Sequence, residues 1–222
     1  MKHPATPLLR SEWPALVLIA LSIVASFYFY AHFPDRVPTH WNISGEVDGY
    51  SGKFFGAWFG PIFMIGMYLL FLLVPYFDPK HEHYAGFRDS YHGIKNLMVA
   101  FMFAVSLFVG IAGLGYNVEI GAVIPVAVGV LFAGLGYFIK SVKQNWAMGV
   151  RTPWTMESPV VWEKTNHLMA GLMMIAGVMI AITAFPFPDM FKAGLFIAAI
   201  LLIVIVPIVY SYIIYQKEQK KG

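Results

Sequence analysis

The run FFGAWFGPIFMIGMYLLFLLVPYF, residues Phe54–Phe77, contains no charged side chain and is long enough to cross a bilayer as one helix. About 20 helical residues span the ~30 Å hydrocarbon core of a membrane. Five further uncharged apolar runs share this property: Trp13–Tyr30, Leu97–Tyr116, Ile120–Ile139, Leu168–Phe185 and Ala193–Tyr215. The sequence therefore predicts an all-α membrane protein with six transmembrane helices.

The composition supports this class. Hydrophobic residues make up 59% of the 222 residues and charged residues only 12%, against roughly a quarter charged in a soluble domain. There are no cysteines, which excludes disulfides, thiolate metal sites and a cysteine nucleophile. The first run follows Lys2 and Arg10, as in a signal peptide, but Ala31-His32-Phe33-Pro34 is a poor cleavage site. We expect a retained first helix.

The placement of basic residues predicts the orientation. Six spans put both termini on one side of the membrane, and twelve of the fifteen Lys and Arg residues fall on that side. The other side holds Arg36, Lys53 and Lys192. Because basic loops stay in the cytoplasm, the protein should be a multi-pass membrane protein with both termini in the cytoplasm, N-in and C-in. The loop after the first helix then faces outward.

The six runs themselves contain no Asp, Glu, Lys, Arg or His. Ion-coupled transporters usually place ionisable groups at membrane depth, so we expect spans without such groups and look for chemistry in the loops. A carrier or lipid-handling protein for a small amphipathic or neutral substrate stays open as the alternative function. Small residues such as Gly129 and Ala133, at four-residue spacing, predict close helix packing.

The outward loop, residues 31–53, concentrates polar residues in HWNISGEVDGYSGK, His40 to Lys53. Residues 39–42 favour a short strand. Ser44-Gly45 and Asp48-Gly49 are typical turn pairs, so the loop should fold back on itself as a compact cover over the bundle.

The polar side chains of this loop allow three interpretations. His40, Asn42, Glu46 and Asp48 resemble a nitrogen and oxygen ligand set, although their spacing fits no known metal motif. They can instead form a self-satisfied turn network, or recognise an external ligand. A metal-dependent membrane enzyme that uses His40 is a third, weaker functional alternative.

The longest inward connection, residues 141–167, pairs basic residues with three tryptophans. Ser158 followed by Pro159 predicts a helix that begins near Pro159 and continues into the fifth span. Arg151 can stack on an indole, form a two-pronged bond to a carboxylate or phosphate, or reach lipid headgroups.

Two segments together resemble a known family. VPTHWNISGEVDGYSGK, residues 37–53, is similar to the N-terminal signature of the SdpI-like bacterial membrane proteins, and GVRTPWTMESPVVWEKTNHLMAG, residues 149–171, to the second signature. The resemblance implies a multi-pass immunity protein of the bacterial plasma membrane, not an enzyme, that confers resistance to a secreted peptide toxin. It also implies that such a protein can hold a cytoplasmic transcriptional repressor at the membrane, without a cofactor, a metal or direct nucleic-acid contact. Membrane lipids are the remaining expected partner.

The resemblance also assigns residues by position. It implies a ligand-binding set in the first signature, comprising His40, Asn42, Gly45, Glu46, Asp48 and Gly49. It implies a partner-binding set in the second, comprising Gly149, Arg151, Thr152, Pro153, Trp154, Thr155, Trp162 and His167. One hypothesis places an amphipathic or cationic toxin near Glu46 and Asp48. The expected organisation is a two-helix unit, residues 1–77, and a four-helix unit, residues 78–222, in one integrated bundle.

Overall fold

The computed structural model describes residues 9–220, which contain six helices long and apolar enough to cross a membrane. The long helices are α1 (Leu9–His32), α2 (Lys53–Phe77), α3 (Arg88–Gly113), α4 (Ile120–Ile139), α6 (Pro159–Ile182) and α7 (Asp189–Gln219). The shorter elements are strands β1 (Arg36–Trp41) and β2 (Val47–Gly52), the 3-10 helix η1 (His81–Phe87) and helix α5 (Pro153–Glu157). The prediction of an all-α membrane protein with six transmembrane helices is confirmed.

Five of the six long helices begin before their apolar runs, and α3 and α6 do so by the widest margin. Helix α3 begins at Arg88 and not at Leu97, and its first turns contain the buried polar residues His92 and Lys95, which hydropathy alone does not assign to the helix. Helix α6 begins at Pro159, as predicted, and the Ser158 hydroxyl accepts a hydrogen bond from the Val161 backbone N–H at 3.2 Å. This hydroxyl satisfies one of the backbone donors left unpaired at the helix start.

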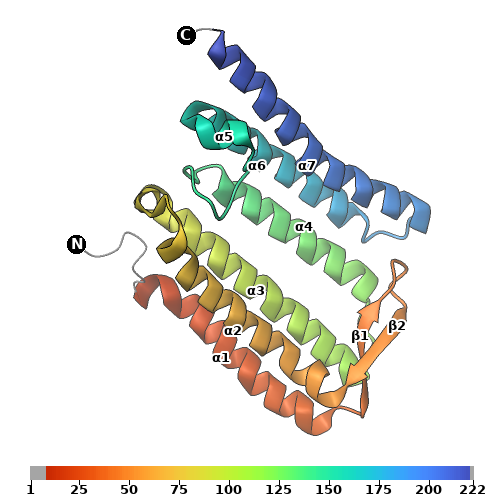
Figure 1. The fold of residues 1–222 in the computed structure, drawn as a ribbon. Coiled ribbons are helices and arrows are strands. Elements are labelled where there is room, and N and C mark those ends of the chain that lie inside the picture. Colours follow the sequence, from red (N-terminus) through yellow and green to blue (C-terminus); the bar gives the residue numbers. More distant parts are fainter. Residues whose placement is uncertain (1–8, 221–222) are drawn as a thin grey trace.

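The helices lie side by side in the order α1, α2, α3, α4, α6 and α7, with the β-hairpin at one end (Figure 1). Helix α3 packs against α1, α2 and α4, while α6 packs against α4 and α7. The start of α1, helix α5 and the end of α7 lie away from the hairpin. We call the two ends of the bundle the hairpin end and the loop end. The orientation stays a prediction, as does the division at residue 77, and Lys2 and Lys221, which entered the charge count, lie outside the described residues.

Helices α4 and α6 approach closely at two glycines. A Cβ atom on Gly129 would lie 2.6 Å from the carbonyl oxygen of Gly177, and one on Gly177 would lie 3.2 Å from the backbone nitrogen of Ala133. Small residues allow such backbone contact between membrane helices. The predicted packing role of Gly129 and Ala133 is confirmed.

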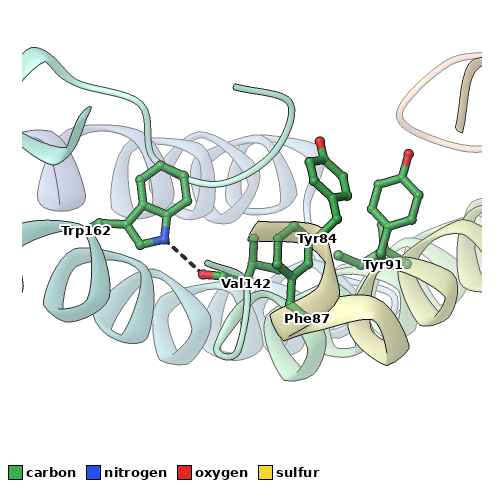
Figure 2. Close-up of a cluster of buried hydrophobic side chains, with 6 residues drawn as sticks. Tyr84, Phe87, Tyr91, Val142 and Trp162 are labelled. Atoms are coloured by element: carbon green, nitrogen blue, oxygen red, sulfur yellow. Dashed lines mark hydrogen bonds between the residues drawn. The ribbon is translucent and has the colours of Figure 1, made fainter. Parts of the chain in front are cut away.

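A cluster of mostly aromatic side chains is buried at the loop end. Its buried members are Tyr84, Phe87, Tyr91, Ile94, Val142 and Trp162. Figure 2 shows the Trp162 indole directed at the Val142 carbonyl, to which its N–H donates a 2.9 Å hydrogen bond. The cluster therefore ties η1 and α3 to α6 and to the connection that follows α4.

At the opposite end, the chain between α1 and α2 forms an antiparallel hairpin. Arg36 pairs with Gly52 and Trp41 with Val47, and the register is irregular around His40. The Val37 side chain is fully buried in a cluster with residues of α1 and α2. The base of the hairpin is thus fixed on the first two helices.

Candidate functional site

The polar side chains of the hairpin are mostly bonded to one another. The Asn42 side-chain oxygen accepts hydrogen bonds from the backbone N–H groups of Ser44 and Glu46, at 3.0 and 2.9 Å. The Asn42 side-chain nitrogen donates to the Glu46 carboxylate at 3.0 Å. The His40 Nδ1 atom lies 2.5 Å from a carboxylate oxygen of Asp48. Both acids of the motif therefore already have partners inside the hairpin.

These contacts bear on the metal interpretation. Among residues 9–220, no group of three His, Cys, Asp or Glu side chains is close enough together to hold a metal ion. The His40–Asp48 pair and the Asn42–Glu46 pair are separate interactions. Within this part of the chain, the hydrogen bonds therefore support the interpretation of a turn network, whereas no contact supports a metal-ligand set.

The tip of the hairpin rests on the starts of α4 and α7. The Ser44 hydroxyl donates a 2.6 Å hydrogen bond to the Asp189 carboxylate. Gly45 has φ +83°, a left-handed conformation that favours glycine. A Cβ atom at Gly45 would lie 3.0 Å from the Cα of Gly121. The hairpin therefore bridges from α1 and α2 to the later helices of the bundle.

Beneath the hairpin lies a cavity of about 460 Å³, which we call the hairpin chamber. Its walls come from β1 and the turn and from α3, α4, α6 and α7, and include His40, Val109, Ile124, Val128, Ile180 and Phe196. Val128 lies in the third turn of α4, so the chamber reaches about 12 Å into the bundle at 1.5 Å per residue. A largely apolar cavity of this size is typical of small-molecule and cofactor sites.

Only part of the predicted ligand-binding set lines this chamber. His40, Asn42 and Gly45 line it. Glu46 and Asp48 hold those residues in place through the bonds described above. A Cβ atom at Gly49 would lie 2.8 Å from the Cβ of His40, so a larger residue there would displace the histidine.

The second motif forms a folded segment at the loop end. Gly149 has φ +105°. Thr152 and Thr155 form a reciprocal capping box at the start of α5, and the Thr152 hydroxyl donates to the Ser211 hydroxyl of α7 at 3.0 Å. Thr155 and Trp162 are buried. These residues support the segment and present little surface to a partner.

Other members of the second set are accessible. Arg151, Pro153 and His167 are exposed, while Trp154 is partly buried and lies 5.0 Å from the Tyr212 ring, centroid to centroid. The Arg151 guanidinium donates a hydrogen bond to the Trp146 backbone carbonyl. This contact differs from the stacking or two-pronged bonding that the sequence suggested.

A second cavity, of about 430 Å³, opens beside this segment, and we call it the loop-end cavity. Side chains of both charges line it, including Glu82, Lys140, Lys143, Glu163 and His167. Its floor includes Val142 and Trp162 of the aromatic cluster. The mixed charge of the rim differs from the apolar lining of the hairpin chamber.

The six apolar runs contain no ionisable residue, but the helices extend beyond the runs and include two buried charges. Glu12 of α1 and Lys95 of α3 form a buried ion pair, with exposed fractions of 4% and 1%. The Tyr68 hydroxyl of α2 donates to the same carboxylate at 2.8 Å, and His92 lies 3.3 Å from it. The apolar runs ended short of both charges, although the helices continue through them. The spacing of His92 and Lys95, which puts both on one helix face, was an available signal.

The fold and these sites define a multi-pass membrane protein with a covered apolar chamber at one end of the bundle and a folded polar segment at the other. Comparison with known proteins refines this class. The family described as "Domain of unknown function (DUF1648)" matches residues 17–65, which contain the hairpin. The family described as "SdpI/YfhL protein family" matches residues 141–211, which contain the loop-end segment.

A curated relative covers nearly the whole chain. The immunity protein SdpI of Bacillus subtilis (strain 168) is 25% identical over 203 residues, which are 91% of this chain and 95% of the relative. No solved structure matches the chain. The resemblance to the SdpI-like family is confirmed, and the six apolar helices together with this similarity indicate a multi-pass protein of the bacterial membrane.

Proposed function

We propose that this protein confers resistance to a secreted peptide toxin and that the hairpin chamber binds an apolar part of the toxin. The relative of matching length is an immunity protein. The observation that carries the proposal is the chamber itself, a largely apolar cavity beneath the first signature. The chamber lies at the hairpin end, which the charge count predicts to be the outer side, where a secreted toxin arrives.

The contacts of the hairpin favour apolar binding over binding to its acids. Glu46 and Asp48 are engaged by Asn42 and His40, so a cationic toxin would have to compete with existing partners. Apolar surface removed from water contributes about 25 cal/mol per Å². The acids of the first signature then serve to hold the hairpin over the chamber.

Survival of a toxin-sensitive bacterial host that expresses this protein tests the proposal, with a secreted peptide toxin as the challenge. Wild type should protect, and Ile124→Trp should weaken protection because the larger ring takes up part of the chamber and obstructs binding there. The matched control is Val126→Trp on the same helix, since Val126 is 46% exposed and does not line the chamber. His40→Ala tests the first signature in the same assay.

The outcomes separate the site from the function. Protection by Ile124→Trp at the wild-type level, in protein present at equal amounts, would remove the chamber from the proposal. No protection by wild type would contradict immunity and favour the alternative, a carrier or lipid-handling protein. Transport of an amphipathic substrate in vesicles would then be the next measurement.

A second function at the loop end rests on its accessible charges. We propose that the loop-end cavity and the neighbouring Arg151 hold a cytoplasmic repressor, because a rim of both charges suits a protein surface better than a lipid tail. A fluorescent fusion of a candidate repressor from the same genome should move to the membrane in the presence of toxin. Lys140→Ala with Lys143→Ala, or Arg151→Ala, should release it, whereas Lys217→Ala, which is outside the cavity, should not. Release by neither change would contradict this role.

A further inference from the structure

The hairpin chamber carries one fixed positive charge. Lys192 lines the cavity at the hairpin end and is partly buried. Across residues 9–220, no carboxylate lies within ion-pair distance of its ammonium group. The nearby acid Asp189 accepts the Ser44 hydrogen bond. Lys192 is therefore a partly desolvated cation, without a carboxylate partner, beside an apolar space.

The position of Lys192 in its helix has no stabilising role. It lies in the first turn of α7, which begins at Asp189, and a positive charge near a helix N-terminus is unfavourable because the backbone N–H groups there already carry partial positive charge. Helix α4 also begins beside the chamber, at Ile120. Each of these helix starts also carries an acid, Asp189 in α7 and Glu119 at the N-cap of α4. Neither acid lines the chamber, whereas Lys192 does, so the lysine is the fixed charge that faces the apolar space.

We infer that the hairpin chamber recognises an apolar segment that carries a carboxylate, with the apolar part inside the chamber and the carboxylate paired with Lys192. This inference rests on the proposed function and names the chemistry of the toxin end that binds. Such a group is a peptide C-terminus that follows apolar residues, or an acidic side chain beside them. The pairing supplies Lys192 with the partner that the protein lacks, and a charge-assisted bond of this kind is stronger than a neutral one.

The dimensions of the chamber suit such a segment. Its walls run from Lys192 at the mouth to Val128 in the third turn of α4. A depth of about 12 Å accommodates a few apolar side chains or an alkyl chain of similar length. A straight-chain carboxylate is therefore the simplest probe of both features.

The probe experiment uses the full chain in nanodiscs of phosphatidylcholine, with a dansyl-labelled undecanoate as the reporter ligand. Dodecanoate should displace the saturable part of the signal at about tenfold lower concentration than dodecylamine, since one ion pair at a partly buried site is worth about that factor. Dodecanol measures the contribution of the chain alone. Ile124→Trp should strongly reduce saturable binding because the larger ring obstructs the chamber.

Variants of the lysine separate charge from shape. Lys192→Gln should weaken dodecanoate about tenfold and leave dodecanol unchanged, and Lys192→Glu should reverse the preference toward dodecylamine. The matched control is Lys53→Gln, which is also at the hairpin end but lies over the Tyr30 ring at 5.4 Å and does not line the chamber. This control should bind as wild type does.

Several outcomes would overturn the inference. Equal displacement by dodecanoate and dodecylamine would remove the charge preference, and undiminished saturable binding by Ile124→Trp would remove the site. Displacement by phosphatidylglycerol without displacement by dodecanoate would assign the chamber to a lipid headgroup. If the wild type protects against the toxin but shows no carboxylate preference, only this inference is refuted. If the wild type shows the carboxylate preference but does not protect, only the proposed function is refuted.

Discussion

The Ser44 hydroxyl donates a 2.6 Å hydrogen bond to the carboxylate of Asp189, a residue 145 positions later in the chain. This bond joins the hairpin tip to the first residue of α7. Together with the close approach of Gly45 to Gly121, it holds the hairpin over the chamber. The position of one short loop therefore depends on helices from the far end of the chain.

Gly45→Ala should detach the hairpin tip. An alanine in the left-handed conformation costs about 1–2 kcal/mol, and its Cβ would lie 3.0 Å from the Gly121 Cα. The chain has no cysteines of its own, so a Ser44→Cys, Asp189→Cys double variant contains a single pair of thiols. This pair should form a disulfide on oxidation, and adding Gly45→Ala should reduce the yield of that disulfide several-fold. Gly52→Ala is the control, since a Cβ there meets nothing within 4 Å. Equal yields for both alanine variants would contradict the close fit of the tip.

Removing one partner of the Glu12–Lys95 pair should strongly destabilise the protein. Glu12→Leu or Lys95→Met leaves a buried charge unpaired, and this should lower the free energy of unfolding by about 3–5 kcal/mol. The double variant should recover most of that loss because it buries no charge. Unfolding in mixed micelles measures all three, with exposed Lys164→Met as the control. Additive losses in the double variant would show that the two charges do not stabilise each other.

Two glycines should respond to alanine in opposite directions. Gly129→Ala should lower the free energy of unfolding by about 1–3 kcal/mol, since its Cβ would lie 2.6 Å from the Gly177 carbonyl oxygen. Gly171→Ala should raise it by about 0.5–1 kcal/mol, because a Cβ there meets nothing within 4 Å and alanine favours the helix. The same unfolding experiment compares them. Similar effects from both would argue against the close α4–α6 contact.

The predicted orientation can be tested by labelling single cysteines from outside intact cells. Ile43→Cys should react with a membrane-impermeant maleimide, because Ile43 is 52% exposed on the hairpin. Lys164→Cys, which is exposed at the start of α6, should react only after the cells are opened. Thr155 is fully buried and would be a poor reporter of the same loop. Labelling of Lys164→Cys in intact cells would reverse the assignment of the two sides.

Local patterns in the sequence predicted the six long helices and the start of α6. A long uncharged run has one stable form in hydrocarbon, a helix that satisfies its own backbone groups, and α4 matches its predicted run at both ends. Ser158 and Pro159 specify a helix start through bonds between near neighbours. The small-residue contact at Gly129 was also predictable, because Gly129 and Ala133 lie four residues apart on one face of the helix.

Hydropathy did not predict the ion pair formed by charged residues beside the apolar runs. Glu12 and Lys95 appear in the sequence as residues of two separate flanks, and only the packing of α1 against α3 pairs them. A charge is tolerated in a buried position when its partner is present, and that partner is 83 residues away. No local window contains both groups.

The chain by itself determined the membrane class, the six helices and the two motif segments, because each depends on residues close together in sequence. Only the tertiary structure decided what those segments do. It engaged Glu46 and Asp48 within the hairpin, buried Thr155 and Trp162, and placed Lys192 beside an apolar chamber. The physical reason is that a cavity and its charged lining form where helices distant in sequence pack together. The hydrophobic pattern of any one helix is compatible with many packing arrangements, so it does not determine the cavity.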